Sequence, residues 1–223
     1  MINAAVFASG SGSNFQALLD REGRGALWRT RLLIVDRAAG ATERAERAGV
    51  EVRHIAVGGR DPVEVGTETL AALRNADVQL IFLAGYLRLV PGTVCGAFPH
   101  RILNVHPALL PMFGGKGMWG AAVHEAVLRS GVRVTGPTVH FVDERYDEGS
   151  ILAQWPVPVL PGDDAATLAA RVLETEHLLY PLAAQHVCRA LAAGERPAPL
   201  APPCETFDAT SLAKLTEEAF RTP

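Results

Sequence analysis

The sequence has few cysteines, no surplus of basic charge and no long apolar run. Its three cysteines, Cys95, Cys188 and Cys204, are widely spaced and form no CxxC pair. An odd number of scattered cysteines argues against a disulfide framework or a zinc site and predicts reduced thiols in a cytoplasmic protein. No segment is apolar for long enough to cross a bilayer, and the N-terminus lacks the basic and apolar regions of a signal peptide.

The chain also lacks the positive charge of a general nucleic-acid-binding protein. Its formal net charge is −3 at pH 7, whereas phosphate contacts along a nucleic acid require a basic surface. Hydrophobic residues make up 48% of the 223 residues, which is enough for a buried core. We therefore expect a soluble cytoplasmic protein with small-molecule partners and without a nucleic-acid or membrane partner.

The first half of the chain is a regular alternation of short apolar runs with helical patterns. This pattern predicts helices after residue 13, at 41–48 and at 61–75, and strands at 2–8, 31–35, 50–56, 78–84 and 101–105. Such alternation is typical of an α/β fold with a doubly wound, mostly parallel sheet and right-handed crossovers. Ligands of these sheets bind beyond the carboxyl ends of the strands.

The second half has a different pattern. It predicts a helix at 120–129 and then two strands, at 132–142 and 150–159, which are joined by a loop at 143–149 and form an antiparallel extension of the sheet. A long helix is expected at 164–193, and beyond Gly194 the chain becomes rich in proline. The sequence thus predicts a single domain at 1–194 and a Pro-rich C-terminal tail at 195–223, with a short helix at 212–220.

A glycine loop at residues 9–14 (SGSGSN) joins the first strand to the first helix. Glycines permit a close approach of the backbone to a ligand, and the free N–H groups at a helix start favour a phosphate. The spacing is neither G-x-G-x-x-G nor a Walker A loop, which disfavours dinucleotides and nucleoside triphosphates. The alternative is a turn in which Ser13 or Asn14 caps the helix and no ligand binds.

Asn104 and His106 stand at the end of the strand expected at 101–105, just before Pro107. Residues two apart leave the same face of an extended chain, so both side chains point to one side. An asparagine amide is a donor for a carbonyl oxygen and a histidine changes charge near neutral pH, so the pair is suited to stabilising an oxyanion. The alternative is a structural asparagine and a histidine whose hydrogen bonds go to the backbone.

An acidic loop between the last two strands carries Asp143, Glu144, Asp147 and Glu148. A carboxylate here is placed to pair with His106 and raise its pKa, or to relay a proton through water. Asp147 is the preferred candidate, but its spacing does not separate it from Asp143 or Glu144. A solvated acidic turn is the alternative.

Several motifs, taken in their order along the chain, resemble the phosphoribosylglycinamide formyltransferase family (glycinamide ribonucleotide transformylases) of purine synthesis. The resemblance covers residues 2 to about 194. It is carried by the 9–14 loop and by LAGYLR at 83–88, NVHPALLP at 104–111, GPTVHFV at 136–142, DEG at 147–149, ARV at 170–172, EH at 176–177 and YP at 180–181. It implies a formyltransferase-like fold, with a phosphate- and nucleotide-binding half at about 1–100 and a catalytic and folate half at about 101–194.

The resemblance also implies a reaction. The amine of 5′-phosphoribosylglycinamide attacks the formyl group of 10-formyltetrahydrofolate, the co-substrate, and no metal takes part. Asn104, His106 and Asp147 match the catalytic residues: Asn104 and a protonated His106 stabilise the oxyanion, and Asp147 relays a proton. His140 resembles a residue that orients the catalytic carboxylate. A monomer or a homodimer is expected.

Binding residues are carried over from the same motifs. The site of the substrate phosphate and ribonucleotide is matched by Ser11, Gly12, Ser13, Asn14 and Glu176. The folate site is matched by Leu87, Arg88, Leu89, Val90, Asn104, Val142, Asp143 and Asp147.

The sequence departs from the family pattern at three places. The segment MFGGKGMW at 112–119 differs from the shorter loop that is common there, and Ser150 stands where a proline is common. No arginine near Arg60 clearly matches one that holds the phosphate in some members. We expect these departures to affect the lid over the site and the affinity for phosphate.

Other formyl-folate enzymes share the Asn-x-His pattern. A methionyl-tRNA formyltransferase is expected to carry a further, basic tRNA-binding domain, and a formyltetrahydrofolate hydrolase a regulatory domain ahead of the catalytic one. A sugar-nucleotide formyltransferase and a non-catalytic folate- or nucleotide-binding module stay open as alternatives.

Overall fold

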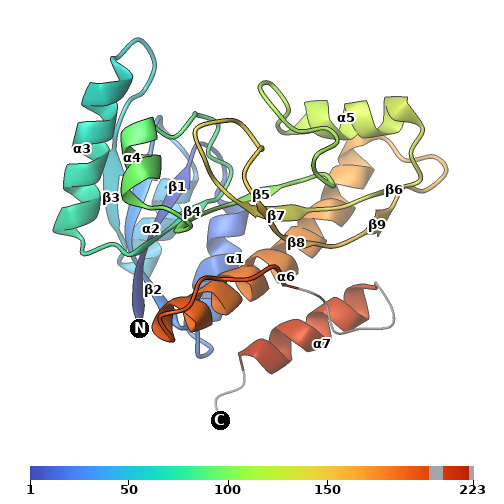
Figure 1. The fold of residues 1–223 in the computed structure, drawn as a ribbon. Helices are drawn as coiled ribbons and strands as arrows, with labels where there is room; N and C mark the ends of the chain where they lie inside the picture. Colours follow the sequence, from blue (N-terminus) through green and yellow to red (C-terminus); the bar gives the residue numbers. More distant parts are fainter. Residues whose placement is uncertain (201–207, 221–223) are drawn as a thin grey trace.

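The computed structural model describes residues 1–200 and 208–220, which form two sheets and the helices around them (Figure 1). The strands of the main sheet are β1 Ile2–Ala8, β2 Trp28–Val35, β3 Glu51–His54, β4 Leu80–Leu83, β5 Ile102–His106, β7 Thr138–Phe141 and β8 Ile151–Gln154. A small second sheet pairs β6 Val134–Thr135 with β9 Val157–Pro158. The helices are α1 Ser13–Glu22, α2 Ala41–Ala48, α3 Pro62–Asn75, α4 Gly92–Ala97, α5 Ala121–Ser130, α6 Ala165–Ala192 and α7 Ala209–Ala219.

The main sheet has the strand order β3-β2-β1-β4-β5-β7-β8. Neighbouring strands from β3 to β5 are parallel, whereas β5 pairs with β7, and β7 with β8, in antiparallel fashion. The expected α/β fold, with a mostly parallel sheet and an antiparallel extension in the C-terminal half, is therefore confirmed. The change of direction occurs at β5, the strand that carries Asn104 and His106.

Helices cover both faces of the main sheet. Ala4 and Val6 of β1 pack in a core with residues of α1, α2 and α6, while Ala5 and Phe7 pack in a second core with α3 and α4. Side chains alternate across a strand, so a strand between two layers of helices needs apolar residues at every position. This explains the continuous apolar runs of the central strands. Within the two described ranges, no helix is both long and apolar enough to cross a membrane.

Two of the expected strands are each divided. The strand predicted at 132–142 breaks into β6 and β7, and the strand predicted at 150–159 breaks into β8 and β9. Gly136 lies at the first break with φ +141°, and a Cβ there would lie 1.9 Å from the carbonyl oxygen of Trp155. The two segments approach too closely for a side chain, and Pro137 and Pro156 at the breaks have no N–H for a sheet ladder.

The remaining differences concern single elements. Helix α4 was not expected, because its sequence GTVCGA contains two glycines and two β-branched residues, which have low helix propensity. Strand β2 begins at Trp28 rather than Arg31. Helix α7 begins at Ala209 rather than Leu212, because the side chain of Asp208 caps it by accepting from the N–H of Ser211.

The C-terminal segment lies against the domain wherever the structure describes it. The N–H of Leu200 donates to the carbonyl oxygen of Leu152 at 2.7 Å, and Leu212 of α7 is fully buried. Parts of the predicted Pro-rich tail, 201–207 with Cys204 and 221–223, lie outside the described residues. The division into a domain at 1–194 and a tail at 195–223 stays a prediction.

Tyr180 joins α6 to the two strands beneath the end of the sheet. Its hydroxyl lies 3.0 Å from the carbonyl oxygen of Leu83 in β4 and 2.9 Å from that of Leu103 in β5. The side chain is fully buried, so water does not replace the hydroxyl as a donor. The contact holds α6 against β5, next to Asn104.

We expect Tyr180→Phe to lower the free energy of unfolding by about 1–3 kcal/mol, because buried carbonyl groups lose a donor. Urea denaturation measures the change. Tyr146→Phe is the matched control: Tyr146 is 36% exposed, and its loss of a hydroxyl should change stability by less than about 0.5 kcal/mol. Equal effects of the two substitutions would show that the Tyr180 contacts do not stabilise the fold.

Candidate active site

A cavity of about 770 Å³ lies beyond the carboxyl ends of β4 and β5. The volume is typical of a small-molecule site, and the position agrees with the rule for open parallel sheets. Two groups of residues expected from the sequence line this one cavity: the pair Asn14 and Glu176, and the trio Asn104, His106 and Asp147.

Strand β5 sends Asn104 and His106 to the same face. Leu103 and Val105, which alternate with them, are buried in the core beside α6. Asn104 pairs in register with His140 of the antiparallel neighbour β7. The switch in strand direction therefore brings a third polar side chain beside the two that the sequence motif supplies.

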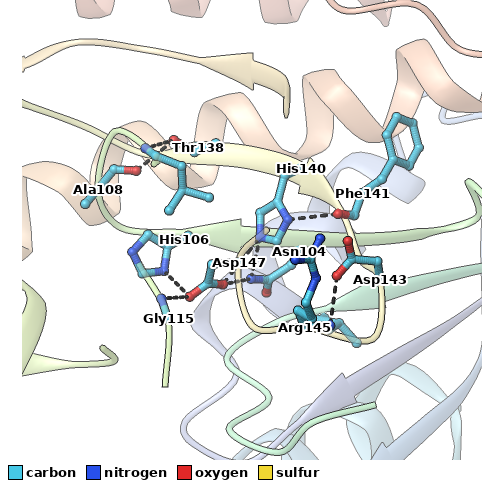
Figure 2. A network of polar contacts seen from close by, with 12 residues as sticks. Asn104, His106, Ala108, Gly115, Thr138, His140, Phe141, Asp143, Arg145 and Asp147 are labelled. Atoms are coloured by element: carbon cyan, nitrogen blue, oxygen red, sulfur yellow. Dashed lines mark hydrogen bonds and ion pairs between the residues drawn. The ribbon is translucent and has the colours of Figure 1, made fainter. Parts of the chain in front are cut away.

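The carboxylate of Asp147 lies among polar groups from three parts of the chain (Figure 2). Its Oδ2 accepts the N–H of Gly115 at 2.9 Å and lies 3.5 Å from Nδ1 of His106. Its Oδ1 lies 3.5 Å from Nδ2 of Asn104 and from Nε2 of His140. The structure thus brings together all three predicted catalytic residues and the predicted supporting residue.

The backbone around Asp147 explains how the loop delivers this side chain. Asp147 has φ +55°, in the left-handed region. Two residues later, a Cβ on Gly149 would lie 1.8 Å from the carbonyl oxygen of Phe141. Only glycine allows this close return of the loop to β7.

The other acidic candidates of the loop have different surroundings. Asp143 accepts the backbone N–H of Arg145 at 2.8 Å within its own turn. Glu144 lies beside Gly92, where a Cβ would be 3.1 Å from its Oε1. The geometry therefore separates Asp147 from Asp143 and Glu144, which the spacing in the sequence did not.

Two backbone carbonyl groups determine which ring nitrogen of His106 and of His140 carries a hydrogen. A carbonyl only accepts, so His106 donates from Nε2 to Phe113 at 2.8 Å, and His140 donates from Nδ1 to Phe141 at 2.9 Å. In the neutral form of each ring the other nitrogen is an acceptor. Nε2 of His140 therefore accepts from Nδ2 of Asn104 at 3.0 Å. His140 orients the amide of Asn104 in addition to facing the carboxylate.

Burial and a neighbouring charge shift the pKa of His106 in opposite directions. Burial lowers the pKa of His106 below its ordinary value, although the nearby Asp147 carboxylate and the Phe113 carbonyl raise it. Burial raises the pKa of Asp147, but contacts with His140, His106 and Gly115 outweigh it and leave that pKa below its ordinary value. A neutral His106 beside a charged Asp147 is thus the favoured ligand-free state, and the predicted protonated His106 has to arise during the reaction.

The glycine loop is held against α2. Gly12 has φ +74° and is the N-cap of α1, so neither Ser13 nor Asn14 is the cap residue. A Cβ on Gly12 would lie 2.8 Å from the Cβ of Ala41, which is why this position requires glycine. Ser11 is exposed and Ser13 is half-buried.

Asn14 connects this loop to α6. Its Nδ2 donates to Oε2 of Glu176 at 2.5 Å, and its own Oδ1 is buried without a hydrogen-bond partner. Burial raises the pKa of Glu176 to about 7, and the hydrogen bond from Asn14 opposes this rise. The contact leaves two groups at the edge of the cavity: the buried acceptor Oδ1 of Asn14, and a carboxyl group whose charge changes near neutral pH.

The residues expected to bind folate are divided by the structure. Leu87 lines the cavity, as do Asn104 and Asp147, whereas Arg88, Leu89, Val90, Val142 and Asp143 do not. The Nε of Arg88 donates to the buried Asp36 at 2.8 Å. Val90 is buried in the core beside α3 and α4, where Val142 also packs.

Sequence reasoning missed several residues of the cavity wall, among them Tyr86, Lys116, Trp119 and His124. Lys116 and Trp119 belong to the 112–119 segment, whose unusual sequence was a signal that something differs there. His124 of α5 has a buried Nδ1 without a hydrogen-bond partner. A single histidine in a helical pattern does not indicate a functional role, so the sequence did not identify it.

The described part of the chain contains no group of three or more histidine, cysteine, aspartate or glutamate side chains placed to hold a metal ion. Cys95 and Cys188 are free thiols. A reaction without a metal stays a prediction.

Residues 2–184 match the formyl transferase family. The chain is 46% identical over 180 residues to the chloroplastic phosphoribosylglycinamide formyltransferase of Arabidopsis thaliana, and 43% identical over 187 residues to that of Vigna unguiculata. These matches cover 79% and 82% of this chain but 62% and 60% of the plant proteins, so the chain spans less than two thirds of their length. The crystal structure of glycinamide ribonucleotide transformylase 1 from Symbiobacterium toebii matches with a TM-score of 0.78 and 44% identity, over 85% of this chain and 88% of that one.

Replacing Asp147 tests the opposing effects on His106. We expect Asp147→Asn to lower the pKa of His106 further, because the negative charge that favours its protonated form is removed. Titration of the imidazole signals by NMR measures this value. Asp143→Asn is the control from the same loop and should leave the His106 titration in place. A rise in the pKa of His106 in Asp147→Asn would contradict the electrostatic assignment.

Glu176 should make stability depend on pH. Its pKa in the folded chain, about 7, lies above the ordinary value of 4.5, so folding favours the protonated form. This contribution, about 3 kcal/mol, is fully present below pH 4.5 and is lost as the pH rises through 7.

The stability of the wild type relative to Glu176→Gln should therefore fall between pH 5 and pH 8, as measured by denaturant unfolding at each pH. Glu174→Gln, at an exposed position of the same helix, should show no such trend. Parallel curves for the wild type and Glu176→Gln would disprove the raised pKa.

Proposed function

The chain belongs to the formyl transferase family, and on that basis we propose that it transfers the formyl group of 10-formyltetrahydrofolate to the amine of 5′-phosphoribosylglycinamide. The products are the N-formyl compound and tetrahydrofolate, in a step of purine biosynthesis. The observation that supports this most is the single cavity that joins Asn14 and Glu176 to Asn104, His106 and Asp147. The proposed enzyme is cytoplasmic, has small-molecule substrates, and works as a monomer or homodimer without nucleic acid or membrane.

The phosphorylated amine is proposed to enter at the glycine loop. The first turn of α1 offers backbone N–H groups and the positive end of the helix dipole to a phosphate, from Ser11, Gly12, Ser13 and Asn14. The buried Oδ1 of Asn14 lacks a donor, and the carboxyl group of Glu176 beside it is suited to hydroxyl groups of a ribose. These two acceptors suit the hydroxyl donors of a sugar.

10-Formyltetrahydrofolate is proposed to occupy the part of the cavity near Leu87, and it supplies an activated formyl carbon. A cavity of about 770 Å³ is large enough for a pterin ring in addition to a sugar phosphate. Leu87 and the aromatic residues Tyr86 and Trp119 give this wall flat, apolar surfaces. Val90 and Val142 pack in the core of α3 and α4 rather than in the cavity wall.

The chemistry that we propose begins with attack of the neutral amine on the formyl carbon. The carbonyl oxygen becomes an oxyanion, which Asn104 Nδ2 and His106 Nε2 stabilise with their hydrogens. A preorganised donor of this kind is worth about 3 kcal/mol of the barrier. His140 holds the Asn104 amide in place for this task, because its Nε2 accepts one amide hydrogen.

Proton transfer is the proposed task of Asp147. The attacking nitrogen loses a proton, which passes through water to the Asp147–His106 pair and then to the folate nitrogen as the carbon–nitrogen bond breaks. Uptake at Nδ1 of His106 creates an imidazolium whose new N–H faces Asp147 at 3.5 Å. The carboxylate thereby stabilises the charged ring that burial alone disfavours.

We expect Asn104→Ala and Asp147→Ala each to lower kcat by about 100- to 1000-fold, because each removes a group that acts in the transition state. The assay follows loss of 10-formyltetrahydrofolate that depends on added 5′-phosphoribosylglycinamide, and circular dichroism checks the fold. Asp143→Ala is the control from the acidic loop and should retain near-normal kcat. Near-normal kcat in either Asn104→Ala or Asp147→Ala would refute the assignment.

The same assay separates the competing activities. Turnover of the folate without the amine supports a hydrolase, and turnover only with an amino sugar nucleotide supports a sugar-nucleotide formyltransferase. Folate binding without any turnover supports a binding module. Each of these results overturns the proposed function.

A further inference from the structure

Arg44 of α2 contacts the glycine loop and the start of α1. Its Nε donates to the carbonyl oxygen of Ser11 at 2.9 Å, and its Nη1 donates to Oε1 of Gln16 at 3.0 Å. A Cβ on Gly12 would lie 3.3 Å from the Cδ of Arg44, so the aliphatic part of the side chain lies against this glycine. One residue of a different helix thus fixes both ends of the turn into α1.

The contact with Ser11 sets the direction of the next N–H group. The peptide unit between Ser11 and Gly12 is planar and trans, so its carbonyl and its N–H point in opposite directions. A carbonyl held by Arg44 therefore directs the N–H of Gly12 away from the guanidinium group. No hydrogen bond in the described ranges uses this N–H as a donor, and Gly12 itself is buried.

The charge of Arg44 is not balanced by a carboxylate. None of the ion pairs among residues 1–200 and 208–220 includes Arg44. Arg60, by contrast, pairs with Glu68 at 2.7 Å and also donates to the carbonyl oxygen of Ala56. Neither arginine lines the large cavity, but Arg44 lines a separate pocket together with Ser13 and Gln16. The cation beside the glycine loop is thus Arg44 rather than Arg60.

We propose that Arg44 is a positioning residue for phosphate: it fixes the Ser11–Gly12 peptide so that the Gly12 N–H faces the phosphate, and it adds positive charge to the loop. The proposal rests on the proposed function, because it takes the phosphate to be that of the amine substrate. The planar guanidinium group is suited to this task, since it donates in two directions at once while it keeps its charge.

The test compares two amines that differ only in the phosphate. In Arg44→Gln, we expect KM for 5′-phosphoribosylglycinamide to rise about tenfold or more, as is usual for the loss of one charge-assisted interaction. We expect kcat and the KM for 10-formyltetrahydrofolate to stay within about twofold, because neither Asn104 nor His106 contacts Arg44. The KM for the dephosphorylated amine, glycinamide riboside, should not change.

Two further variants act as controls. Arg44→Lys keeps the charge but not the fork of donors, and we expect it to restore part of the affinity for the phosphorylated amine. Arg47→Gln removes an exposed arginine from the same helix and should behave as the wild type. Equal increases in KM for both amines in Arg44→Gln would show that Arg44 only maintains the fold, and an unchanged KM would show that it does not act on phosphate. Either result overturns the proposal.

Binding of ribose 5-phosphate, measured by calorimetry, separates this inference from the proposed function. If the wild type does not transfer a formyl group but binds ribose 5-phosphate in an Arg44-dependent way, the proposed function fails and the role of Arg44 stands. If the wild type is active and its affinity for ribose 5-phosphate equals that of Arg44→Gln, the role of Arg44 fails and the function stands.

Discussion

The carboxylate of Asp147 is the group on which the arrangement of the site depends. A buried negative charge is unfavourable unless donors surround it, and here Gly115, Asn104, His106 and His140 lie within 3.5 Å of its oxygens. These residues come from the paired strands β5 and β7 and from the segment after Pro111. The N–H of Gly115 and Nδ2 of Asn104 donate to the charge, and His106 adds a donor when its Nδ1 is protonated.

The sheet provides the frame for this arrangement. Because β7 runs antiparallel to β5, His106 at the end of β5 lies opposite Thr138 at the start of β7. The acidic loop that follows Phe141 therefore has to return along β5 to bring Asp147 to His106. Tyr180 ties α6 to β4 and β5 from below, and Glu176 stands one turn earlier on the same helix. Helix α6 therefore links the glycine loop, through Glu176, to the strand that carries Asn104 and His106, through Tyr180.

Much of the fold follows from local patterns in the sequence. The apolar runs and helical repeats predicted the parallel half, because a strand buried on both faces has to be apolar throughout. The breaks at Gly136 and Trp155 were not predicted, since they arise from a close approach of two segments that are distant in sequence. Helix α4 was missed because its residues have weak helix propensity and tertiary packing alone determines it.

The site was predictable in its residue types but not in its geometry. The spacing on a strand made Asn104 and His106 candidates, and the family resemblance matched them and Asp147, whereas spacing alone did not separate Asp147 from Asp143. The contact between His140 and Asn104 depends on an antiparallel register that no motif encodes. Arg44 had no signal at all, because its partner is a backbone carbonyl group 33 positions earlier.

The hydrogen bond from His106 Nε2 to the carbonyl of Phe113 has a thermodynamic consequence for the whole segment that follows Pro111. A single N–H cannot serve the Phe113 oxygen and an oxyanion equally well, so the two arrangements compete as members of one equilibrium. Ligand-free molecules favour the arrangement with the His106–Phe113 hydrogen bond. The apparent affinity for the substrates is therefore reduced, because only a fraction of the molecules has the His106 N–H free. Residues of the 112–119 segment that do not line the cavity can therefore affect the site through this population alone.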